Sequence, residues 1–168
     1  MTARRLLLPR PEDTRALGAA LGRLLRPGDL VVLTGTLGAG KTTLTQGLGE
    51  ALGVRGAVTS PTFVIARVHP STVGGPPLVH VDAYRLGGAL ELDDLDLDAE
   101  VEDSVTVVEW GHGLAEGLAP DRLEVVLDVD PRTEVRTATV TGVGPRWSGG
   151  GDLADRADPL AALGGEPC

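Results

Sequence analysis

The sequence predicts an α/β fold, a three-layer sandwich in which helices flank a mixed central sheet. Three observations predict it. Residues 30–33 and 105–108 are short, apolar, β-rich runs, typical of strands buried on both faces. The apolar residues of 14–25 recur at helical spacing. Further strand-like segments follow one another with short links instead of alternating with helices, which favours a sheet with both parallel and antiparallel pairs.

The elements of the first third of the chain are predicted from local patterns. Residues 4–8 suggest a short edge strand, and the prolines after it stop the pairing. A turn at 27–29, with the sequence Pro-Gly-Asp, separates the helix at 14–25 from the buried strand at 30–33. A glycine-rich loop and a helix at about 41–52 follow.

The middle of the chain is predicted to be strand-rich. A loop leads into a strand at 62–68, and period-two alternation indicates another strand at 78–84. Residues 91–103 contain eight acidic residues, and one or two short helices are expected across 89–103. The acidic run favours a solvated face over a docking surface for a basic partner or a metal site. An antiparallel pair is expected at 123–129 and 135–143.

The length of 168 residues fits one domain, which we place at residues 1–144. From residue 145 onward the chain is mostly Gly, Ala, Asp and Pro without sustained periodicity. We therefore expect residues 145–168 to be a disordered tail whose removal leaves the domain intact.

Charge and cysteine content narrow the possible functions. The net charge of −9 argues against a broad basic face for nucleic acid, so any RNA is expected to be reached through a partner. The only cysteine is Cys168, so an intrachain disulfide cannot form, as is usual in a reducing cytoplasm. No apolar run resembles a signal peptide or a membrane span, and we expect a cytoplasmic protein without membrane contact.

The glycine-rich loop carries the most specific motif in the chain. It reads Gly35-Thr36-Leu37-Gly38-Ala39-Gly40-Lys41-Thr42 and matches the Walker A pattern of P-loop proteins at each required position. The glycines let backbone N–H groups and the helix N-terminus surround an anion. Lys41 reaches the outer phosphates, and the Thr42 hydroxyl is suited to bind Mg²⁺. The loop predicts a site for ATP and Mg²⁺, against the alternative of a glycine-rich turn with a surface lysine.

A P-loop needs an acidic partner at the end of a buried strand. Glu109 ends the strand at 105–108, and Asp82 lies in the alternating segment 78–84. Both are candidates to reach the metal, and the alternatives are a solvated strand-end carboxylate for Glu109 and a residue on a polar strand face for Asp82. We expect His80 to be an ordinary strand residue rather than a general base.

These features together resemble the TsaE family, formerly YjeE, of small bacterial ATPases that act in threonylcarbamoyladenosine synthesis in tRNA. The resemblance covers about residues 12–141. It rests on four blocks in order, which are Gly38-Ala39-Gly40-Lys41-Thr42-Thr43, Thr59-Ser60-Pro61-Thr62-Phe63, His80-Val81-Asp82-Ala83-Tyr84-Arg85-Leu86 and Val107-Val108-Glu109-Trp110.

The resemblance implies roles for individual residues. Lys41, Asp82 and Glu109 are the catalytic candidates, with Thr42, Glu109 and Asp82 on Mg²⁺. Residues 60–63 are implied to be a switch loop that senses the nucleotide, formed by Ser60, Pro61, Thr62 and Phe63. The expected nucleotide contacts are Gly35, Leu37, Gly38, Ala39, Gly40, Lys41, Thr42, Thr43, Thr14, Trp110 and Arg132.

The resemblance also implies partners and a mode of action. TsaE-like proteins work with TsaB and TsaD, and TsaD performs the transfer to tRNA. ATP hydrolysis, slow in the isolated protein and stimulated by partners, resets their complex. The main alternative is a P-loop small-molecule kinase, although the arginines after Glu109 form no clustered lid motif. A GTPase is disfavoured because the chain contains no Asn for a guanine-specificity block, and a module that only binds ATP remains a further alternative.

Overall fold

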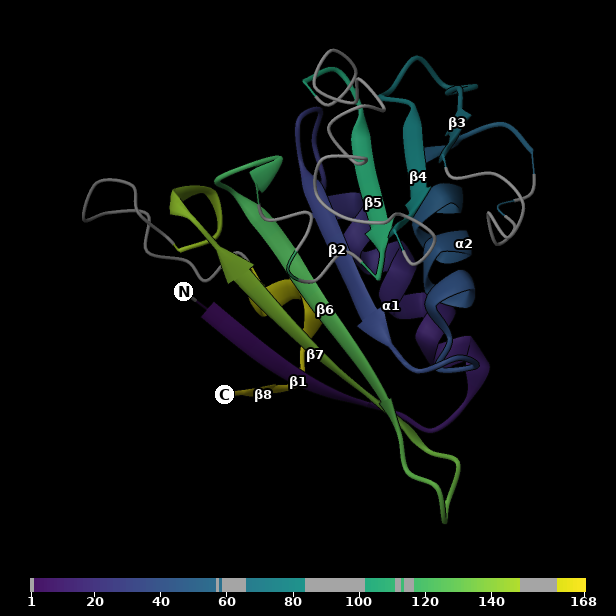
Figure 1. Cartoon of the computed structure of the whole chain (residues 1–168), viewed down its shortest axis with the longest axis vertical. Coiled ribbons are helices and arrows are strands. Elements are labelled where there is room, and N and C mark those ends of the chain that lie inside the picture. The colour runs from purple at the N-terminus through teal and green to yellow at the C-terminus, as the bar shows by residue number, and fades with distance from the viewer. Residues whose placement is uncertain are drawn as a thin grey trace.

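The computed structural model describes residues 2–56, 58, 66–83, 102–110, 113, 117–148 and 160–168. Its centre is an eight-stranded sheet with the order β3-β4-β5-β2-β6-β7-β1-β8 (Figure 1). The strands are β1 (Thr2–Leu8), β2 (Leu30–Gly35), β3 (Ala66–His69), β4 (Leu78–Asp82), β5 (Val105–Glu109), β6 (Arg122–Val129), β7 (Arg136–Val143) and β8 (Glu166–Pro167). The helices are α1 (Pro11–Leu24) and α2 (Lys41–Leu52), with short 3₁₀ turns η3 (Pro145–Trp147) and η4 (Ala161–Leu163).

The four strands β4, β5, β2 and β6 run parallel, and every other neighbouring pair in the sheet is antiparallel. The expected mixed sheet is therefore confirmed. Because the carboxyl ends of parallel strands meet at one edge, the loop after β2 lies at the same edge as the ends of β4 and β5. The topology thus brings the glycine-rich loop and both predicted acids together.

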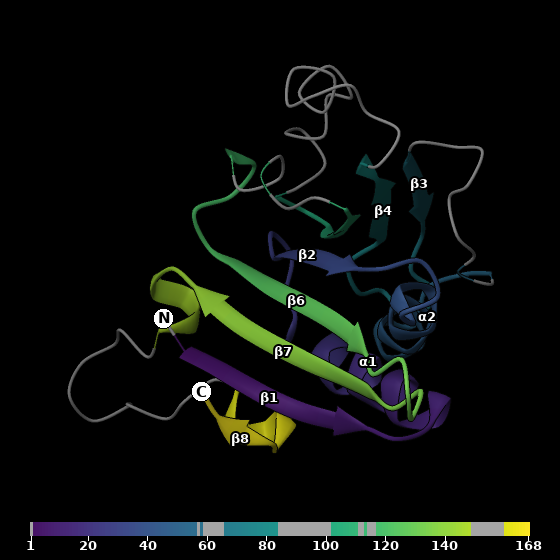
Figure 2. The ribbon, with the colours of Figure 1, turned by 60° about the horizontal axis from the view of Figure 1, so that its bottom comes forward.

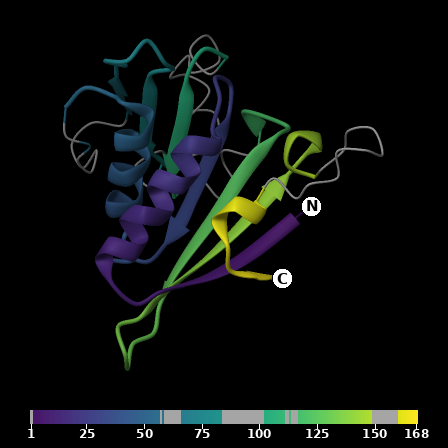
Figure 3. The same ribbon diagram turned by 180° about the vertical axis from the view of Figure 1, so that it is seen from behind.

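Both described helices cover the same face of the sheet (Figures 1 and 3). Their apolar sides and the facing strand residues form the main core, which includes Leu21, Leu44, Leu48 and Val107. A second apolar cluster on the opposite face contains Val32, Val79 and Val108. The short helices expected at 89–103 fall almost wholly outside the described residues. Within the described part of the chain, no helix is both long and apolar enough to cross a membrane.

Glycines allow α1 and α2 to pack with their backbones in close contact. A Cβ atom on Gly18 of α1 would collide with the Leu44 carbonyl of α2, and one on Gly47 would collide with the Arg15 carbonyl of α1. Neither position therefore accepts a side chain without a shift of the other helix. This packing fixes α2, and with it the loop that leads into α2, against the rest of the domain.

Most elements lie where local patterns predict them. The α1 helix starts at Pro11, three residues before the expected start at residue 14, because proline is well suited to the first turn. The antiparallel pair β6–β7 is confirmed. The structure describes β3 only from Ala66, so most of the strand expected at 62–68 lies outside the described residues. Strand β1 is not an edge strand, because β8 pairs along its outer side (Figure 2).

The described residues of the C-terminal segment pack against the domain, which contradicts the expectation of disorder for them. The Trp147 side chain is 1% exposed, and Leu160 is fully buried in the main core. Arg146 donates two hydrogen bonds to the Asp29 carboxylate, at 2.9 and 2.8 Å, and its guanidinium lies 4.2 Å from the centre of the Trp147 ring. The prediction failed because isolated large side chains anchor this segment, and periodicity does not detect them.

Candidate functional site

The glycine-rich loop has the conformation that anion binding requires. It follows β2 directly and ends at Gly40, the N-cap of α2. Gly38 and Gly40 have φ angles of +80° and +106°, which side-chain-bearing residues rarely adopt. A Cβ on Gly40 would also lie 3.3 Å from Thr14 Cγ2. The loop therefore needs glycine at Gly40 for both its backbone angle and its space.

Lys41 is buried against its own loop. Its Nζ donates to the carbonyl oxygens of Gly35, at 2.8 Å, and Thr36, at 3.0 Å. Burial lowers the pKa of Lys41, and the nearby Glu109 and Asp82 carboxylates partly oppose that shift. The structure thus brings together the cation and the two acids that the sequence singled out.

Asp82 and Glu109 lie at the ends of β4 and β5 and are directly opposite each other in the strand register. Both are buried, with 8% and 4% of their surfaces exposed. Thr42, in the first turn of α2, contributes a hydroxyl at the same edge. These are oxygen donors, which Mg²⁺ prefers.

The donor set fits Mg²⁺ in a nucleotide site better than a metal held by protein alone. No group of three or more His, Cys, Asp or Glu side chains suited to a metal occurs among the described residues. Mg²⁺ at such sites usually binds one or two carboxylates, water and phosphate oxygens. Glu109, Asp82 and Thr42 are the residues that would hold it.

Two further predicted contacts flank the loop. The Trp110 ring lies 4.2 Å from Lys41 Nζ, which stacks the ammonium group on an aromatic face. Trp110 has a φ angle of +59°, unusual for a bulky residue, and its backbone N–H donates to Leu33 O at 2.8 Å. Thr14, in the first turn of α1, is 1% exposed and adjoins Gly40. The structure therefore gathers both residues at the loop.

The arginine that contacts the loop in the structure is Arg136, which the sequence did not single out. From the start of β7 its Nε donates to Ala39 O at 3.0 Å, and its Nη2 donates to Gly38 O at 3.1 Å. Arg132, the predicted arginine, is exposed in the β6–β7 turn, where its backbone N–H donates to Asp130 Oδ1. The hairpin extends past the edge at which β2 leads to α2 (Figure 1). Nothing in the local sequence distinguishes Arg136 from an ordinary strand arginine.

His80 is more than the ordinary strand residue that we expected. Its Nε2 lies 2.9 Å from Glu109 Oε1, and both side chains are buried. The two residues come from adjacent parallel strands, so only the sheet brings them together.

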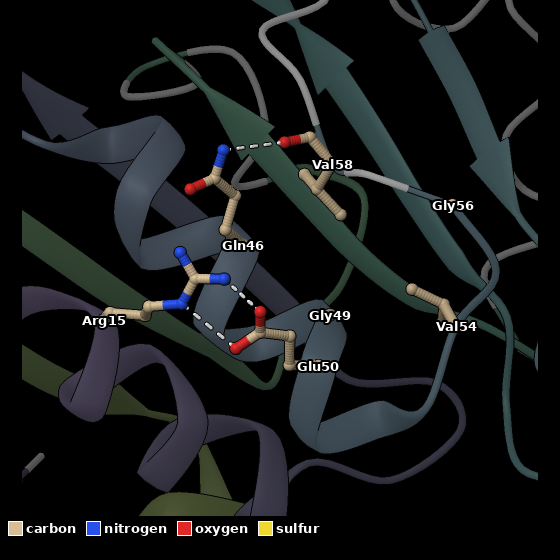
Figure 4. Close-up of a pocket in the computed structure, with 7 residues that line it drawn as sticks. All are labelled: Arg15, Gln46, Gly49, Glu50, Val54, Gly56 and Val58. Atoms are coloured by element: carbon tan, nitrogen blue, oxygen red, sulfur yellow. Dashed lines mark hydrogen bonds and ion pairs between the residues drawn. The ribbon is translucent and has the colours of Figure 1, made fainter.

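The predicted switch residues, Ser60 to Phe63, lie outside the described residues. Just before them, Val58 is tied to α2, because Gln46 Nε2 donates to Val58 O at 3.0 Å (Figure 4). The two residues line a hollow of about 190 Å³, together with Arg15, Gly49, Glu50, Val54 and Gly56. No residue of the phosphate loop lines this hollow.

Comparison with known proteins points to one family. The sequence model described as "Threonylcarbamoyl adenosine biosynthesis protein TsaE" matches residues 8–138. A Streptomyces coelicolor protein named tRNA threonylcarbamoyladenosine biosynthesis protein TsaE is 67% identical over 138 residues, or 80% of this chain and 93% of that protein. Its namesake from Mycobacterium tuberculosis is 52% identical over 139 residues, or 79% and 83% of the two chains.

A solved structure gives the same result. The crystal structure of YdiB from Bacillus subtilis matches with a TM-score of 0.72 and 33% identity, covering 88% of this chain and 91% of that chain. Together with the Walker A loop between β2 and α2, this likeness confirms the expected P-loop α/β fold.

Proposed function

The chain belongs to the TsaE family, and on this basis we propose that it is a Mg²⁺-dependent ATPase of tRNA threonylcarbamoyladenosine synthesis. One observation carries the proposal. The buried Lys41 of the glycine-rich loop lies beside two carboxylates, Asp82 and Glu109, at the ends of neighbouring parallel strands. A cation for phosphates and acids for a metal are what phosphoryl transfer from ATP requires.

Each group has a distinct task in the proposed reaction. The backbone N–H groups of the loop and the N-terminus of α2 bind the phosphates. Lys41 exchanges its bonds to loop carbonyls for bonds to phosphate oxygens, and Thr42 and Glu109 hold Mg²⁺. Bound Mg²⁺ supplies positive charge that stabilises the charge developing on the phosphates. Asp82 orients water at the same edge.

Partners complete the proposed function. The described site contains no strong general base, and its arginine, Arg136, is engaged with the loop carbonyls. We infer that hydrolysis is slow in the isolated protein and is stimulated by TsaB and TsaD, which it resets between turnovers. A group supplied by a partner can raise such rates on the order of 10³-fold or more. The net charge of −9 favours indirect contact with tRNA, and work on tRNA favours a cytoplasmic location.

The test is phosphate release from ATP over a magnesium titration, with and without a TsaB–TsaD complex. Glu109→Gln and Thr42→Val are expected to lower the rate and shift the titration to higher Mg²⁺, because each removes one oxygen ligand. Glu124→Gln makes the same chemical change on β6, where Glu124 pairs with Arg122, and should leave the titration unchanged. A parental titration in both site variants would refute the metal assignment, and a rate indifferent to the partners would refute the coupling.

A further inference from the structure

His80 and Glu109 form a buried pair directly behind the proposed metal site. The His80 side chain is fully buried and that of Glu109 is 5% exposed. An ionised carboxylate only accepts hydrogen bonds, so the 2.9 Å contact requires the proton to be on His80 Nε2. The imidazole is therefore the donor to Glu109 Oε1.

We propose that His80 is a positioning residue that fixes the orientation of the Glu109 carboxylate for Mg²⁺. This inference rests on the proposed function, because it assigns a task relative to the metal. The hydrogen bond engages one carboxylate oxygen and leaves the other for the metal or its water. Residues that orient a ligand in this way commonly change metal affinity or activity by about 10- to 100-fold when they are removed.

The strand geometry explains why a histidine can reach Glu109. In the register, Asp82 is opposite Glu109 and His80 is opposite Val107. Side chains two residues apart on one strand share a face, so His80, Asp82 and Glu109 all lie on the same face of the sheet. His80 lies one step deeper than Asp82, which leaves the edge itself to the two acids.

A neutral imidazole suits this position better than a lysine or an arginine. His80 Nδ1 is buried and has no hydrogen-bond partner among the described residues. If Nδ1 carried a proton, an N–H group would be buried without an acceptor, which is costly. The Nε2–H tautomer avoids that cost and keeps the negative charge of Glu109 available for a cation.

Two amide substitutions separate positioning from simple packing. The terminal nitrogen of glutamine can take the place of imidazole Nε2, whereas that of asparagine corresponds to Nδ1 and does not reach Glu109. His80→Gln should therefore restore the contact, and His80→Asn should lose it. Thr106→Val is the matched control, because Thr106 is fully buried on the opposite sheet face and its hydroxyl has no partner among the described residues.

The measurement is the calorimetric affinity for a nonhydrolysable ATP analogue, in EDTA and across a series of free Mg²⁺ concentrations. We expect His80→Asn to need about tenfold more free Mg²⁺, or more, for its half-maximal effect, with little change in EDTA. His80→Gln and Thr106→Val should stay near the parent. In a Glu109→Gln background, His80→Asn should cause no further shift, because the carboxylate it orients is gone.

Each result decides between the alternatives. A parental Mg²⁺ midpoint for His80→Asn, equal defects in both amide variants, or an undiminished shift in the Glu109→Gln background would overturn the proposal. Melting curves verify folding, and His80→Leu replaces His80→Asn if the latter does not fold. If the parent itself binds no nucleotide, or binds it without regard to Mg²⁺, the proposed function fails first.

Discussion

Arg136 connects β7 to the phosphate loop, and its replacement tests whether the sheet prepares that loop for ATP. Its guanidinium donates to two loop carbonyls, Ala39 O at 3.0 Å and Gly38 O at 3.1 Å. Holding these carbonyls fixes the orientation of the intervening peptide groups, whose N–H groups are to face the phosphates. In Arg136→Ala the loop would have to be ordered by the nucleotide itself, which lowers the affinity.

The expected size of the effect follows from the two bonds. A hydrogen bond to a charged group contributes about 1.5–3 kcal/mol, and partial solvent access places this pair near 1.5 kcal/mol in total. Since about 1.4 kcal/mol corresponds to a factor of ten, ATP should bind about tenfold more weakly. Calorimetry with ATP in EDTA measures this directly.

A charge-conserving variant provides the control. Arg136→Lys keeps the positive charge but cannot bond both carbonyls with one planar group, so it should recover only part of the affinity. Full recovery would mean that Arg136 acts by charge alone. Parental affinity in a folded Arg136→Ala protein would refute the reasoning altogether.

Three further predictions address the loop and the C-terminal segment. Trp147→Ala should cost about 3–5 kcal/mol in urea unfolding, whereas Leu7→Ala, at a side chain 68% exposed, should cost little; equal effects would contradict the packing of the tail. Gly40→Ala should sharply weaken ATP binding in calorimetry, because alanine is strained at a φ of +106° and crowds Thr14, and an unaffected variant would show that the loop tolerates a side chain. Lys41→Ala should abolish productive ATP binding without loss of thermal stability, because burial of the ammonium lowers its pKa and is itself unfavourable; a lower melting temperature would assign Lys41 a structural role.

The local patterns in the sequence were sufficient for much of the fold. Apolar runs predicted β2 and β5, and the antiparallel partners β6 and β7 followed from alternation. The C-terminal segment was missed because Trp147 and Leu160 are buried by contacts that are distant in sequence. A single large side chain has no periodicity, so its burial depends on where the rest of the chain leaves room.

The sequence by itself determined the chemistry of the site: a Walker A loop with Lys41 and Thr42, and acids at the ends of two strands. These are short-range features, because loop conformation and strand ends depend on neighbouring residues. The tertiary structure alone decided what supports them. Arg136 reaches Ala39 across 97 residues, and His80 reaches Glu109 across 29. Such contacts depend on strand order and register, which are set by packing of the whole sheet and are not encoded in any one segment.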